Sequence, residues 1–231
     1  MGTIIWVVSE GGNLRDRIAE LSSDKGPVVQ VRRGEVCVLP SPGLILIECD
    51  FQCRFESCSK KFRLAHSYPD IPTCLIRPML NDTASGSHQC YLGSWLNTTD
   101  EQPPEIWANL LANLKKPYYL KEEFSRPCLR ILGLQSQIVA AKGKIATLPR
   151  LADGTLRSVS WLSKYFGSVT SRSPKAFVNT IRLCHCLWDV VCSDAPIKSI
   201  AYEYGYSTAH FSYIFHRRFA NWPMEARQKC L

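Results

Sequence analysis

The sequence has no long apolar run. Its longest apolar stretches, residues 4–8 and 44–47, are far shorter than the roughly 20 residues that a helix needs to cross a bilayer. Residues 1–25 carry four charged side chains between positions 10 and 17, too early for the apolar core of a secretory signal. We therefore expect a cytoplasmic protein with no membrane partner.

The second half of the sequence has few acidic residues. Residues 126–231 hold 15 Lys and Arg against 5 Asp and Glu, a net charge of +10, whereas residues 1–125 hold 13 against 15, a net charge of −2. A basic half is typical of a domain that binds a polyanion, and a solvated basic face is the alternative reading. The 231 residues are enough for two modest domains.

The cysteines lack the spacing of a metal site. Of the eleven, Cys49 and Cys53 form a close pair, but no second pair completes the four ligands that structural zinc requires. Cys58 and His66 are the remaining weak candidates, so we expect no metal and no cofactor. The odd number also argues against a fully paired disulfide framework. Reduced core thiols are expected, and a redox-sensing thiol at Cys58, near two lysines, is an alternative.

The first part of the chain has the pattern of an α/β domain. Short apolar runs predict four buried strands, and an apolar stripe that follows Asn13 predicts a helix to about residue 21. Continuous apolar strands are typical of a parallel sheet covered on both faces. A polar, proline-bearing stretch and a helix from Pro104 to about Lys115 follow. The predicted strands are residues 4–8, 28–31, 43–47 and 73–76, and the polar stretch is 97–104.

This order of elements loosely resembles the receiver domain of bacterial response regulators. The resemblance implies acidic residues after the first strand and an Asp after the third, which bind magnesium and accept phosphate. The matching places here hold Glu10 and either Glu48 or Asp50, and Arg77-Pro78 replaces the family's Lys-Pro. We expect a degenerate receiver-like fold in this region, and an unrelated small α/β sensor is the alternative.

Residues 148–227 contain one pattern written twice, 49 residues apart. Five identities at this spacing, together with matched apolar positions, indicate an internal repeat of helix-turn-helix units. Residues 174–192 between the units are apolar on nearly every face, which predicts a buried connecting helix. The identical pairs are Ala152 and Ala201, Ser158 and Ser207, Ser163 and Ser212, Phe166 and Phe215, and Pro174 and Pro223.

Each unit has the local chemistry of a helix-turn-helix. Gly205 suits a turn that needs positive φ, and Ser207 suits the cap of the following helix. Leu162 with Phe166, and Phe211 with Phe215, are spaced i, i+4 and would anchor the two recognition helices. By this spacing the outward residues are Val159, Ser160, Ser163 and Lys164 in the first unit, and Thr208, Ala209, Ser212 and Tyr213 in the second.

The motifs at these fixed spacings are similar to the AraC/XylS-type DNA-binding domain. They include Ile200-Ala201, Gly205-Tyr206-Ser207, Arg217-Arg218-Phe219 and Trp222-Pro223 in the second unit, and Leu151-Ala152 and Ser173-Pro174 in the first. The resemblance implies that the eight outward positions read base edges. Basic residues beside the recognition helices are expected to contact phosphates, whereas Arg182 is expected to make an internal ion pair. The phosphate candidates are Arg172, Lys175, Lys198, Arg217 and Arg218.

The sequence therefore predicts an α/β sensory or dimerisation domain over residues 1–116, a linker over 117–125 and an AraC-type DNA-binding domain over 126–231. We expect a non-enzymatic transcriptional regulator, with activation favoured by the resemblance. Its expected partners are double-stranded DNA, RNA polymerase and a second copy of itself. The alternatives are a DNA alkylation-response protein with a zinc-bound cysteine, a phosphorylated response regulator, and a module that acts only through partner proteins.

Overall fold

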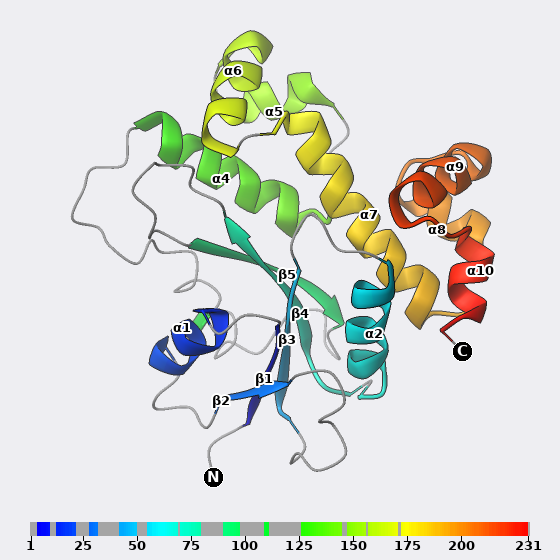
Figure 1. Ribbon diagram of the computed structural model, residues 1–231. Helices are drawn as coiled ribbons and strands as arrows, with labels where there is room; N and C mark the ends of the chain where they lie inside the picture. The colour runs from blue at the N-terminus through cyan, green and yellow to red at the C-terminus, as the bar shows by residue number, and fades with distance from the viewer. Residues whose placement is uncertain are drawn as a thin grey trace.

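The computed structural model shows an α/β N-terminal region and an all-helical C-terminal region (Figure 1), which confirms the predicted fold class. Within the described ranges no helix is long and apolar enough to cross a membrane. The predicted linker, Cys53, Glu10, Asp50 and most of the helix predicted from Pro104 lie outside the described residues. The residues that the structure describes are 4–9, 13–21, 28–31, 42–49, 55–68, 70–79, 90–97, 109–110, 126–144, 147–155, 157–170 and 172–230.

The described strands form one sheet in the order β2-β1-β3-β4-β5. The first four are parallel to one another, and they fall where the sequence predicted strands. The fifth pairs antiparallel with β4 and was not predicted, because Gly93 and Ser94 interrupt its apolar pattern. The bounds are β1 Ile5–Val8, β2 Val28–Val31, β3 Leu44–Glu48, β4 Thr73–Met79 and β5 Cys90–Asn97.

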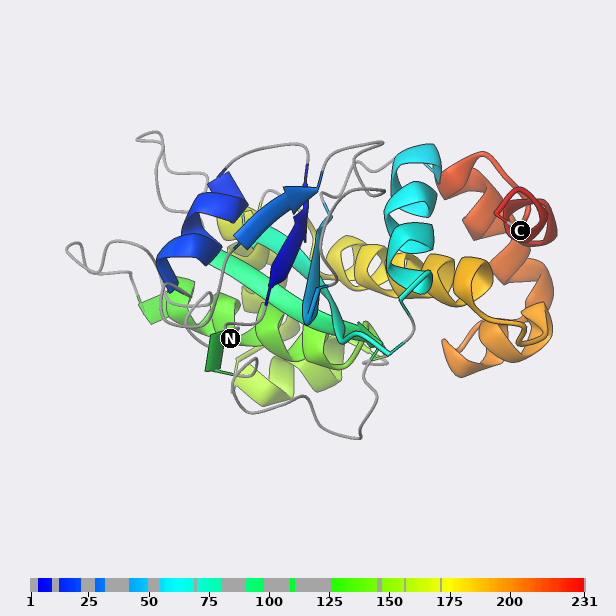
Figure 2. The same cartoon turned by 90° about the horizontal axis from the view of Figure 1, so that it is seen from below.

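Two helices of the N-terminal region are described beside the sheet. The predicted helix α1, Asn13–Leu21, buries Leu14 and Ile18. The second, α2 (Phe55–His66), was not predicted, although its buried residues Phe55, Cys58, Phe62 and Ala65 follow the helical spacing of three and four. Figure 2 shows α2 between the sheet and the C-terminal helices.

The C-terminal helices reproduce the sequence repeat. In the second unit α8, α9 and α10 each begin 49 residues after α5, α6 and α7, their counterparts in the first. The helix predicted over 126–145 ends earlier, because residues 141–143 form a turn with Gly143 at φ +71°. The bounds are α4 Arg126–Ala140, α5 Leu148–Thr155, α6 Val159–Thr170, α7 Pro174–Cys192, α8 Ile197–Glu203, α9 Thr208–Phe219 and α10 Pro223–Gln228.

Helix α7 is the predicted buried connector, and it takes part in two cores. Phe177 and Ile181, near its beginning, pack with Leu162 and Phe166 of the first unit. Residues from Leu183 to Val191 belong to a second core, which contains the second unit together with residues of the sheet and α2. In that core the rings of Phe62 and Trp188 meet edge to face, with centroids 5.4 Å apart. The N-terminal region is thus packed directly against the helix that joins the two repeats.

Candidate nucleic-acid interface

The recognition helix of the first unit is α6. The Ser158 side chain accepts a hydrogen bond from the backbone N–H of Trp161 at 3.1 Å, which caps the start of the helix. Leu162 and Phe166 are fully buried, as the i, i+4 spacing predicted. The four residues predicted to point outward, two before Leu162 and two between the anchors, are exposed, so one face of α6 is open to a ligand. The exposed residues are Val159, Ser160, Ser163 and Lys164.

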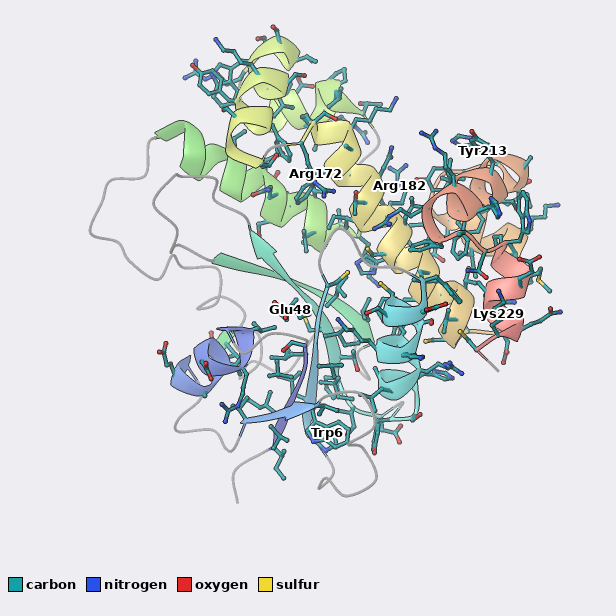
Figure 3. All side chains as sticks on the ribbon, in the orientation of Figure 1. Trp6, Glu48, Arg172, Arg182, Tyr213 and Lys229 are labelled. Carbon is teal, nitrogen blue, oxygen red and sulfur yellow. The ribbon has the colours of Figure 1, made fainter. Side chains whose placement is uncertain are left out.

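The recognition helix of the second unit, α9, is held in the same way. Gly205 has the predicted positive φ of +76°, and the Ser207 side chain accepts from the backbone N–H of His210. Phe211 and Phe215 are fully buried. On the opposite side Ala209 and Tyr213 are exposed, and Thr208 and Ser212 are half-buried. Tyr213 is 57% exposed and lies on the outer side of α9 (Figure 3).

Further exposed residues widen the face of α9. His210 and Arg217 lie on one stripe of the helix with Tyr213, at i, i+7 and i+3. His216 stacks on Trp222, with ring centroids 4.3 Å apart. Our sequence analysis did not select the two histidines, although the same helical spacing that placed Tyr213 outward was available to find them.

The basic residues predicted to contact phosphate divide into two groups. Lys175, Lys198 and Arg217 are exposed. Arg172 and Arg218 are half-buried, and the Arg218 guanidinium lies over the Phe219 ring at 5.5 Å. The three exposed side chains are the most accessible to a polyanion, and phosphate contact by all five stays a prediction.

Arg182 ties the two units together. It lies on α7 (Figure 3), and its Nε donates a hydrogen bond to the carbonyl oxygen of Gly143 at 2.9 Å, in the turn after α4. Its guanidinium also lies 5.2 Å from the centre of the Tyr206 ring, in the turn before α9. Arg182 thus faces the interior of the domain, as expected, but the partners described here are a backbone carbonyl and an aromatic ring rather than the carboxylate of the expected ion pair. A Cβ on Gly143 would lie 2.8 Å from the Val178 carbonyl oxygen, so glycine permits this close approach.

A second contact joins the same two units, at a place that we call the joint: the turn after α4, the middle of α7 and the residues between α8 and α9. Lys144 Nζ lies 2.6 Å from a carboxylate oxygen of Glu203, at the end of α8, and 4.9 Å from the centre of the Tyr204 ring. Both charged side chains are more than one-third exposed, so the ion pair contributes little, at most about 1 kcal/mol. It is therefore a minor contact between the two units beside that of Arg182.

Arg227 of α10 holds the end of the second unit against the end of α7. Its Nε donates to the carbonyl oxygen of Val190 at 3.0 Å, and its Nη2 donates to that of Ala195 at 2.7 Å. The end of α7 leaves carbonyl groups without helical partners, and the guanidinium of α10 supplies hydrogen bonds and positive charge there. This arginine therefore serves the fold of the domain.

Two ionisable side chains of α7 lie near the contact between the two units, His185 buried and Asp189 half-buried. Burial, followed by the charges of Lys142 and Lys144, lowers the pKa of His185 to about 3, so this imidazole is neutral at pH 7. Burial raises the pKa of Asp189, and a hydrogen bond from Tyr204 acts in the opposite direction. Asp189 thus has a partner in Tyr204, the residue directly after α8.

The cysteine candidates do not converge on a metal. Among the described residues there is no group of three or more His, Cys, Asp or Glu side chains that could hold one. Cys49 and Cys58 are buried in the core, whereas His66 is exposed. Of the two lysines near Cys58, Lys61 instead donates to the Glu48 carbonyl oxygen at 3.1 Å.

The C-terminal part of the chain matches a known domain family. A model of a helix-turn-helix domain family matches residues 151–229. The C-terminal domain of AraT, a response regulator from Geobacillus stearothermophilus, aligns at 20% identity and a TM-score of 0.40, over 47% of this chain and 88% of that one. The xylose-binding transcription activator XylR aligns at 13% identity and a TM-score of 0.40, over 99% of this chain and 70% of that one. No curated protein matches the sequence.

The matched residues hold two helix-turn-helix units, each with a capped recognition helix, joined by a buried α7. Residues 151–229 therefore belong to the AraC type of helix-turn-helix DNA-binding domain found in regulators of transcription.

Proposed function

We propose that this protein is a sequence-specific transcriptional regulator that inserts α6 and α9 into successive major grooves on one face of the DNA. The observation that carries the proposal is the pair of equivalent helices, each anchored by two buried residues and exposed between them. A major groove admits an α-helix, and two helices held one turn of DNA apart read two half-sites.

The exposed residues determine what kind of reading is possible. Most of the eight are short, so they offer few of the paired hydrogen bonds that distinguish bases. Lys164 is the basic residue among the eight, and its ammonium group can donate to the acceptors of a guanine edge. Lys175, Lys198 and Arg217 would hold the backbone phosphates, which adds affinity and orientation but no direct sequence information.

The N-terminal region would control this binding. Sheet, α2, α7 and the second unit share one core, so a change in the sheet can reach the second unit through packed side chains. We assign residues 1–116 a sensory or dimerisation role, and residues 117–125 the role of a linker. We further propose that the protein activates transcription, because its repeated motif resembles the AraC/XylS-type domain. RNA polymerase and a second copy of the chain are its proposed protein partners.

The base-reading role of Lys164 gives the decisive test. Bound sites are first mapped across the genome, and affinity is then measured by fluorescence anisotropy on a mapped site and on a scrambled duplex. Lys164→Ala should weaken the mapped site by about 1–3 kcal/mol, the range of a good base contact, with a smaller effect on the scrambled duplex. Lys60→Ala, which removes an exposed lysine from α2, is the matched control for charge. An equal loss on both duplexes would reject base reading by Lys164, and an absence of specific binding would reject the proposed function.

A further inference from the structure

Most of the cysteine side chains that the structure describes belong to one core. Of the seven cysteines whose surroundings the structure describes, six belong to the core shared by the sheet, α2, α7 and the second unit, or pack against it. Cys74 lies in a different cluster, on the other side of the sheet. Figure 3 shows several of the sulfur atoms around α2 and α7. The six are Cys49, Cys58, Cys184, Cys186, Cys192 and Cys230.

Two of these thiols meet across the junction of the two regions. The Sγ atoms of Cys49, directly after β3, and Cys184, on α7, are 3.9 Å apart. Cys49 is 4% exposed and Cys184 is 5% exposed. The backbone N–H of Cys49 donates to the Ile76 carbonyl oxygen at 2.9 Å, and Cys184 is fixed in a helix. The two backbones are thus held by regular structure on both sides of the contact.

We propose that Cys49 and Cys184 are a redox modification site, which a hydroperoxide converts into a reversible disulfide. The inference is independent of the proposed DNA binding. A disulfide needs the two sulfur atoms about 2 Å apart, so they must approach by about 2 Å, which rotations about the Cα–Cβ bonds of two short side chains can supply. Hydrogen peroxide is the fitting oxidant, because it is small enough to enter a core that excludes larger thiol reagents.

The reaction balances without a further reagent. The thiolate of one cysteine attacks a peroxide oxygen, the O–O bond breaks, and the sulfur becomes a sulfenic acid. The thiolate of the other cysteine attacks that sulfur, the S–S bond forms, and the hydroxyl group leaves. The two thiol protons end on the two oxygen atoms. Two thiols are oxidised, one hydrogen peroxide is reduced, and two waters are released.

Neighbouring thiols are poorer candidates for the same chemistry. Cys184 and Cys186 are two residues apart on a helix, so they point in different directions and do not bridge each other. Cys192 instead has its Sγ 3.7 Å from the carbonyl oxygen of Phe62.

The bond would connect distant parts of the chain. Cys49 and Cys184 are 135 residues apart in sequence, so the bridge would close a long loop and restrict the unfolded chain. It would also attach the end of β3 covalently to the helix that joins the two recognition units. The oxidation state of this pair would then determine how firmly the N-terminal region is held to the DNA-binding domain.

The test uses the full-length protein and hydrogen peroxide, with catalase to stop the reaction. Remaining thiols are alkylated in denaturant, and peptides are mapped by mass spectrometry before and after reduction. We expect one linked peptide pair, containing Cys49 and Cys184, and faster migration of the denatured chain on a non-reducing gel, both reversed by dithiothreitol. The oxidised protein should melt higher, by on the order of 5–10 °C.

Cys49→Ser and Cys184→Ser should each abolish the linked peptide and the gel shift. Cys74→Ser, which alters a buried thiol on the same sheet outside this cluster, should leave both unchanged. Linkage of a different pair, or persistence of both thiols while the folded protein is oxidised elsewhere, would overturn the proposal. Peptide mapping of the unaltered chain gives this answer even if a serine variant fails to fold.

Discussion

Arg182 should hold the two recognition units in a fixed relative position, and Arg182→Ala should let them bind DNA independently of each other. The substitution removes the hydrogen bond to the Gly143 carbonyl oxygen and the contact with the Tyr206 ring. A hydrogen bond from a charged donor contributes about 1.5–3 kcal/mol, and a cation–π contact contributes about 0.5–1 kcal/mol. Because Arg182 is only half-buried, we expect the free energy of unfolding to fall by about 2–3 kcal/mol.

The consequence for DNA binding follows from geometry. When the joint is loose, docking one recognition helix no longer places the other over its groove, and the advantage of two linked sites declines. We expect affinity for a duplex with both half-sites to fall by about tenfold, equivalent to about 1.4 kcal/mol, and affinity for a single half-site to stay nearly unchanged. Urea denaturation gives the stability, and fluorescence anisotropy on the two duplexes gives the affinities.

Lys144→Ala is the matched control, because it removes the exposed ion pair with Glu203 from the same joint and should cost at most about 1 kcal/mol of stability. Arg182→Lys keeps a positive charge but lacks the flat guanidinium that stacks on Tyr206, and we expect it to restore only part of the loss. If Arg182→Ala weakened the single and double half-sites equally, the arginine would act on DNA directly and the coupling role would be refuted.

Two further predictions concern stability. Ala220 ends α9 in the left-handed region at φ 53°, where glycine is less strained than alanine. Ala220→Gly should therefore raise the free energy of unfolding by about 0.5–1 kcal/mol in urea denaturation. A loss of stability would show that packing of the alanine methyl group outweighs the backbone strain. The pKa of His185 is depressed from 6.5 to about 3 in the folded state, so as the pH falls the unfolded chain takes up a proton before the folded chain does. The stability that neutral His185 gives the folded state is therefore fully present above pH 6.5. As the pH falls from 6.5 toward 3, the free energy of unfolding should decrease by about 1.4 kcal/mol per pH unit. His185→Gln should remove this part of the pH dependence, and an unchanged slope would contradict the assignment.

The sequence determined the repeated part of the molecule because its signals are local. Pro174 and Pro223 begin equivalent helices, Ser207 caps α9, and Gly205 has the positive φ that its turn requires. Helical spacing placed Lys164 and Tyr213 outward without knowledge of any distant contact. The first four strands were equally readable, since each is a short apolar run buried by a parallel sheet.

Tertiary structure decided what depends on partners far away in the chain. Strand β5 has a weak local pattern and is defined by its antiparallel pairing with β4. Arg182 meets Gly143 across 39 residues, and Cys49 meets Cys184 across 135 residues, and no spacing rule connects such positions. The sequence thus determined two recognition helices and their exposed residues, whereas only the packing of α7 against both units and the sheet decided what holds those helices in place, because side-chain contact between distant segments is a property of the folded chain.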